Sequence, residues 1–111
     1  MSADMKLTIR TPCGPSQTVA YTGTAGSIGS PLPVSAQAVQ IICTTLAFVK
    51  ISFGDAVTAA TVTDIPIAPN FPMVFPIDRP TAPGVDTAGK TWVSAIQSAA
   101  GGNLHVLPLQ G

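Results

Sequence analysis

Proline and glycine recur along the whole chain, and this spacing limits its fold more than any other feature. The 111 residues include eleven Pro and ten Gly, which are spread along the chain rather than gathered in one tract. Pro interrupts helices and Gly weakens them, whereas both are common in the turns between short strands. Val, Ile and Thr, whose branched side chains favour the pleated sheet, are abundant between the turns. The sequence therefore predicts an all-β protein, with helix in less than about 10% of its residues against the usual third.

Apolar and polar residues alternate in several segments, which is typical of strands with one buried face. We expect residues 38–44 and 47–53 to form one hairpin, and residues 92–98 and 103–109 to form another. Further strands are predicted at 5–11, 17–22 and 56–63, with proline-containing edge segments at 65–69 and 72–77. The side chains predicted to form the core are Val39, Ile41, Val49, Ile51, Phe53 and Ile96.

The length of the chain fits a single domain that covers residues 1–111. Short strands separated by turn signals every 8–12 residues or so predict a small antiparallel β-sandwich of the jelly-roll or Greek-key type, with extended loops or an arm. A small closed barrel is the alternative. The stretch 23–33 (GTAGSIGSPLP) has no periodicity and is predicted to be a loop or an arm. An arm could become ordered on a neighbouring molecule, and its removal would leave the sandwich folded.

Charged residues are scarce, which bears on the partners of this protein. Only 9% of the residues are charged, against about 25% in ordinary domains, and the net charge is zero. Such a surface has little electrostatic repulsion, so we expect other copies or a larger assembly to cover much of it. Neutrality argues against nucleic acid as a partner. No apolar run approaches the roughly 20 residues of a membrane helix, and no secretory signal is evident, so we expect no membrane association and synthesis in the cytoplasm.

The residue types that carry chemistry are few and are not arranged as a recognisable site. His105 is the single histidine, and we expect it at the surface or in an interface. Trp92 is expected to be a core or interface anchor, although Trp92 and Tyr21 could also be stacking surfaces for a sugar. The sequence predicts no catalytic, metal-binding or cofactor-binding residue and no enzyme activity. Asp residues occur in or near predicted turns or the N-terminal segment, at positions 4, 55, 64, 78 and 86.

Two cysteines, Cys13 and Cys43, leave two alternatives open. In a reducing cytoplasm both are expected to be thiols, and a buried thiol behaves as a small apolar side chain. A disulfide formed after release into an oxidising medium is the alternative, and would add about 3 kcal/mol to stability in the loop-entropy model. We expect freshly purified protein to contain two thiols.

The second half of the chain carries a pattern of strand and turn segments that resembles a known family. The pattern begins with FVKISFG at 48–54, AVTA at 56–59 and DIPI at 64–67. It continues with VSAI at 93–96, AGGNL at 100–104 and VLP at 106–108. These segments resemble small structural proteins encoded among the head genes of tailed double-stranded DNA bacteriophages. The similarity covers roughly residues 38–111.

The resemblance implies a capsid decoration, or cement, protein: a β-sandwich module that binds the outside of the mature head and stabilises it. It also implies the major capsid protein and other copies of this chain as partners, and the capsid surface of the virion as its location. A trimer would suit the local three-fold axes of a capsid lattice, with dimers and bound monomers as alternatives. The resemblance implies no residue-level binding site. A head-completion or tail-associated structural protein and a small carbohydrate-binding module are the alternative functions.

Overall fold

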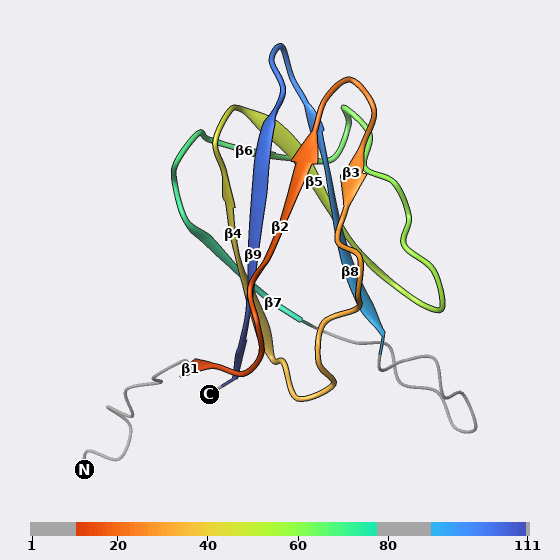
Figure 1. Cartoon of the computed structure of the whole chain (residues 1–111), viewed down its shortest axis with the longest axis vertical. Helices are drawn as coiled ribbons and strands as arrows, with labels where there is room; N and C mark the ends of the chain where they lie inside the picture. Colours follow the sequence, from red (N-terminus) through yellow and green to blue (C-terminus); the bar gives the residue numbers. More distant parts are fainter. Residues whose placement is uncertain (1–10, 78–89, 111) are drawn as a thin grey trace.

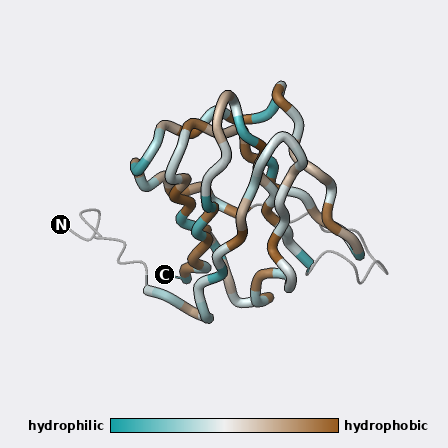
Figure 2. The backbone as a smooth tube through the Cα atoms, turned by 45° about the horizontal axis from the view of Figure 1, so that its top comes forward, coloured by the Kyte–Doolittle hydropathy of each residue, from teal (hydrophilic) through white to brown (hydrophobic). Residues whose placement is uncertain are grey.

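The computed structural model describes residues 11–77 and 90–110, and in this part of the chain strands alternate with turns and loops. About 52% of the described residues are strand and none is helical. Hydrophobic and hydrophilic stretches are interspersed along the backbone, as Figure 2 shows. The predicted all-β fold, with strand well above one third, is confirmed. The strands are β1 (Thr11–Pro12), β2 (Gln17–Tyr21), β3 (Gly26–Ser27), β4 (Ala38–Cys43), β5 (Ala47–Phe53), β6 (Ile65–Ile67), β7 (Met73–Pro76), β8 (Thr91–Gln97) and β9 (Gly102–Gln110).

The strands form two antiparallel sheets that pack face to face (Figure 1). Sheet A has the order β2-β9-β4-β7, with β1 pairing beside β2 on the last residues of β9. Sheet B has the order β3-β8-β5-β6. Each strand of the first half pairs with one of the second half, so that β2–β9, β3–β8, β4–β7 and β5–β6 form nested antiparallel pairs. This is one long hairpin rolled into a sandwich, which is the jelly-roll topology.

The two predicted hairpins are wrong, although their strands are in the expected places. β4 belongs to sheet A and β5 to sheet B, so the connection between them crosses from one sheet to the other. β8 and β9 are separated in the same way. Each of these strand pairs packs its apolar faces together across the sandwich instead of sharing a hydrogen-bonded ladder.

The core lies between the two sheets and contains half of the predicted core residues. Val39, Ile41 and Val49 are fully buried, and Ile51 packs against this cluster while remaining half-buried. Phe53 is half-buried and lies outside the cluster. The prediction for Ile96 is wrong, because its neighbour Ala95 faces the core and the alternation of β8 directs Ile96 to the outer face.

The stretch 23–33 packs on its own domain and is not a free arm. It contains β3, and the N–H of Ile28 continues the pairing with a hydrogen bond to the Val93 carbonyl (3.1 Å). Ile28 and Leu32 are buried in the core, with 3% and 2% of their surfaces exposed. Deleting this stretch would therefore remove core side chains, contrary to the expectation that the sandwich would stay folded without it.

A second difference concerns residues 56–63, which form no strand. They belong to the β5–β6 loop, residues 54–64, in which Thr58, Ala60 and Thr61 donate their N–H groups to side chains rather than to a neighbouring strand. Their β-branched composition resembles that of a strand, but side-chain acceptors satisfy the backbone instead.

One prediction concerns the corner where β2 turns into β3. A Cβ atom at Gly26 would overlap the backbone carbonyl of Ala20, whereas a Cβ at Gly29 would have no atom within 4 Å. Gly26→Ala should therefore lower the free energy of unfolding by about 1–3 kcal/mol or more, measured by urea denaturation. Gly29→Ala is the matched control and should change it by less than about 0.5 kcal/mol. Equal stability of the two variants would show that β2 and β3 are not packed this closely.

Candidate functional site

Formal charges in the described part of the chain are confined to sheet B and its connections. They are carried by Lys50, Asp55, Asp64 and Lys90. Lys50 and Asp64 form one ion pair and Lys90 and Asp55 another, each with a nitrogen–oxygen distance of 3.6 Å. Asp55 and Asp64 lie in turns, as predicted, while Asp4, Asp78 and Asp86 lie outside the described residues.

The outer face of sheet A presents no formal charge on its described strand residues. Two rows of cross-strand neighbours form its centre: Thr18, His105 and Ile42 in one row, and Leu107, Gln40 and Val74 in the other. A further row toward the end of the sheet contains Leu109 and Ala38, which are buried. Val74 has 47% of its surface exposed, while Ile42 and Leu107 are half-buried. This face is thus a mixture of aliphatic, hydroxyl, amide and imidazole groups.

His105 lies near the middle of this face, between β2 and β4. Its Nδ1 atom is 3.1 Å from the Thr18 hydroxyl oxygen, and its other cross-strand neighbour is Ile42. The side chain is half-buried at the surface of the domain, as the sequence predicts. The described residues contain no group of three or more His, Cys, Asp or Glu side chains that could hold a metal ion.

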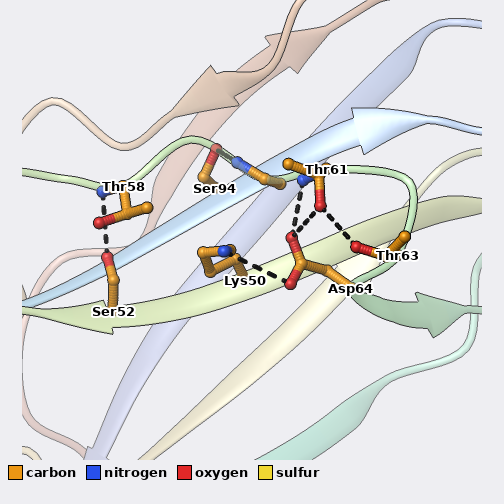
Figure 3. Close-up of polar contacts among 8 residues, drawn as sticks. Lys50, Ser52, Thr58, Thr61, Thr63, Asp64 and Ser94 are labelled. Carbon is orange, nitrogen blue, oxygen red and sulfur yellow. Dashed lines mark hydrogen bonds and ion pairs between the residues drawn. The ribbon is translucent and has the colours of Figure 1, made fainter.

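The outer face of sheet B, in contrast, is covered by the β5–β6 loop (Figure 3). Ser94 points outward from β8 but is fully buried, because the loop lies over it. The Ala60 N–H of the loop donates a hydrogen bond to the Ser94 hydroxyl oxygen (3.0 Å). The Ser94 hydroxyl donates to the Gly26 carbonyl (3.2 Å) and accepts from the Ser27 hydroxyl (3.0 Å). Ser94 therefore links the loop to β3 and is inaccessible as a nucleophile.

One further hydrogen bond holds the same loop against β5, and another lies within the loop (Figure 3). The Thr58 N–H donates to the Ser52 hydroxyl (3.2 Å), and the Thr61 N–H donates to the Asp64 carboxylate (2.7 Å). The hydrogen bond from the Thr61 backbone, assisted by the Lys50 ammonium, holds the pKa of Asp64 below its usual value. The polar cluster of Figure 3 is thus explained by the hydrogen bonds and the ion pair that attach the loop to β5 and β8. Its lysine and serine residues need no catalytic role to account for their positions.

The two aromatic residues considered for sugar stacking do not form a common platform. Tyr21 has only 1% of its surface exposed, and its hydroxyl donates to the Thr45 carbonyl (2.8 Å) and accepts from the Thr45 N–H (3.1 Å). It therefore secures the connection between β4 and β5. Trp92 is half-buried on β8, where its indole N–H donates to the Gly54 carbonyl (2.9 Å).

Both cysteines are free thiols, in agreement with the expected thiol content. The Cys13 N–H donates to the Pro108 carbonyl, while Cys43 lies opposite Leu104 on the other side of β9. Four residues of strand span about 13 Å, well beyond the roughly 7 Å Cα separation that a disulfide tolerates. Burial raises the pKa of the Cys43 thiol to about 11, against the opposing effect of its hydrogen bond with Tyr21.

Sequence reasoning missed the separation of charged and uncharged outer faces. Alternation identifies which residues of a strand point outward, but the assignment of strands to the two sheets depends on long-range pairing. The one available signal was that Lys50 precedes the β5–β6 loop and Asp55 and Asp64 lie within it, with no charge in residues 11–49.

We predict that the loop depends on Ser94 for its attachment. Ser94→Ala should lower the free energy of unfolding by about 1–3 kcal/mol, because the buried Ala60 N–H and Gly26 carbonyl would lose their partner. Urea denaturation measures the effect. Ser98→Ala, in the exposed turn after β8, is the control and should be nearly neutral. A neutral Ser94→Ala would mean that the loop is not fastened through this hydroxyl.

The thiols should differ in reactivity. Cys43 is buried, and pH 8 lies well below the pKa of its thiol, which is about 11. Only the half-exposed Cys13 should therefore react with a thiol reagent in the native protein at pH 8. Both should react after denaturation without a reductant. Equal reaction rates for the two cysteines in native protein would contradict the burial of Cys43, and fewer than two reactive thiols after denaturation would indicate a disulfide.

In residues 11–77 and 90–110 no helix is long and apolar enough to cross a membrane. No protein-family model, curated protein or solved structure matches this chain. The geometry of the two outer faces is therefore the strongest guide to its function.

Proposed function

We propose that this chain is a capsid decoration protein of a tailed bacteriophage: a structural module without enzymatic activity that binds the outer surface of the head and stabilises it. The observation that carries the proposal is the uncharged outer face of sheet A. The resemblance of residues 38–111 to small head proteins supports the same function.

An uncharged sheet face suits a broad protein contact because its burial leaves no ionic group without a partner. Burying an unpaired charge is costly, and the centres of protein interfaces are depleted of charged residues. On sheet A the exposed Val74 and the half-buried Ile42 and Leu107 supply apolar area. Gln40 and Thr18 supply hydrogen-bonding groups. Sheet B is less suited to this contact, because its own loop and both ion pairs occupy that side.

The topology agrees with this function without deciding it. Jelly rolls occur in viral capsid proteins, lectins and cupins, and a fold by itself does not assign a function. Burial of Tyr21 removes one of the two aromatic surfaces that favoured carbohydrate binding. A cement protein instead needs a flat face that can bridge neighbouring capsid subunits, and stabilises the shell by binding its intact form. In this proposal the partners are the major capsid protein and further copies of the chain, and the site of action is the virion surface.

A charge placed on the face of sheet A tests this proposal. His105→Asp should weaken binding to assembled heads about tenfold or more, because the carboxylate would be buried without a partner. Val62→Asp is the matched control, since Val62 is 59% exposed in the loop that covers sheet B. It should bind like the wild-type protein. Co-sedimentation with heads lacking the protein measures both affinities, with melting temperatures as a check on folding.

The same assay includes outcomes that oppose the proposal. Failure of the wild-type protein to bind assembled heads, or equal binding to isolated capsid protein, would contradict decoration. A copy number near six or twelve per virion, rather than hundreds, would indicate a head-completion or tail-associated protein. Equal weakening by both Asp variants would mean that the face of sheet A is not specifically involved.

A further inference from the structure

The connection between β6 and β7 exposes a large aromatic side chain. Phe71 has 57% of its surface exposed and lies in the sequence Pro69–Asn70–Phe71–Pro72. The other large apolar side chains exposed in the described part of the chain are aliphatic: Val34, Leu46, Val62, Ile65 and Val74. Aromatic residues are over-represented among those that dominate binding energy in protein interfaces.

The backbone around Phe71 is held in place before any partner binds. Pro69 and Pro72 each have a restricted φ angle, and Pro69 forms a bridge with Cys43. Asn70 adopts the left-handed conformation, with φ of 57°, and its N–H donates to the Cys43 carbonyl (2.7 Å). A segment ordered in this way loses little conformational entropy on binding, so more of the contact energy remains as affinity.

The free edge of β7 is closed to another strand. The Ile77 N–H donates to the Gln37 carbonyl, and because antiparallel pairs alternate, Phe75 and Met73 also direct their backbone groups toward β4. Positions 72, 74 and 76 then face away, and two of these are proline and have no N–H to offer. A partner at this edge must therefore contact side chains rather than add a strand.

We propose that Phe71 is the aromatic anchor of the decoration contact, and that it inserts into an apolar pocket on the capsid protein. This inference rests on the proposed function and assigns its central contact. Asn70 is hydrogen-bonded to Cys43, the last residue of β4, and Val74 lies on the outer face of sheet A, so the segment that carries the anchor lies at the end of that sheet. The segment 65–77 contains no charged side chain. An apolar pocket is thus the chemical complement of this part of the surface, whereas a charged groove would be left unpaired.

Replacing Phe71 while preserving the turn tests the anchor. Phe71→Ala should weaken binding to assembled heads about tenfold or more, and Phe71→Leu should weaken it less because part of the apolar contact remains. Val62→Ala is the control, since Val62 is as exposed as Phe71 but lies in the loop over sheet B. It should bind normally. The melting temperatures of all three variants should stay close to that of the wild-type protein, because both side chains are largely exposed.

The outcomes separate this inference from the function on which it rests. If wild-type protein does not bind heads, decoration is wrong and the anchor is wrong with it. If the wild-type protein binds heads and both Phe71 variants bind them as tightly as the wild-type protein does, the anchor alone is wrong. If Val62→Ala weakens binding as much as Phe71→Ala, exposed apolar area contributes without a specific pocket, which also overturns the inference.

Discussion

The pairing of each strand from the first half of the chain with one from the second half is the constraint on which the rest of the structure depends. β9 illustrates it, because this strand bonds to β2 on one side and to β4 on the other. The nested pairs place the inward faces of β4 and β5 opposite each other, which creates the core. They also make residues 54–64 the turning point of the whole chain. This arrangement also determines where the loop-covered outer face of sheet B, the uncharged outer face of sheet A and the charged groups lie.

Rolling one hairpin into two layers produces two outer faces that have different surroundings. The turning point lies on sheet B, and its backbone finds acceptors in Ser52, Ser94 and Asp64. On the outer side of sheet A the described strands supply neutral side chains. Neutrality has opposite effects on the free protein and on a protein contact. It lowers the solubility of the free protein, yet it removes the desolvation penalty that charges would impose on a contact.

Local patterns predicted most strands but not their partners. The period of two in 47–53 coincides with β5, because that strand has one face in the core. The same period cannot distinguish a turn within a sheet from a crossing between sheets, so β4 and β5 were predicted as a hairpin. In β8 Val93 and Ala95 occupy the core face and Ile96 lies outside, so the alternation of this strand was assigned to the wrong face. Residues 56–63 have strand-like composition, but no alternation can show that Ser52 in β5 and Ser94 in β8 bind their backbone. The absence of charge in residues 11–49 is visible in the sequence, but the uncharged face itself could not be predicted from it, since that face depends on which strands share a sheet.

Nesting also determines the order in which the pairs can close at the lowest entropic cost. β5 and β6 are joined by residues 54–64, and once a pair has formed, the next pair outward closes only the two connections that flank it instead of the whole chain between its strands. We therefore expect folding to proceed outward from β5–β6, with β2 joining β9 last. Until then the apolar side chains of Leu104 and Val106 in β9 are not covered by those of β2. The partly folded chain therefore exposes apolar surface through which it can associate with other molecules. Proline in both β6 and β7 then keeps incomplete molecules from joining edge to edge, because it offers no N–H to another strand.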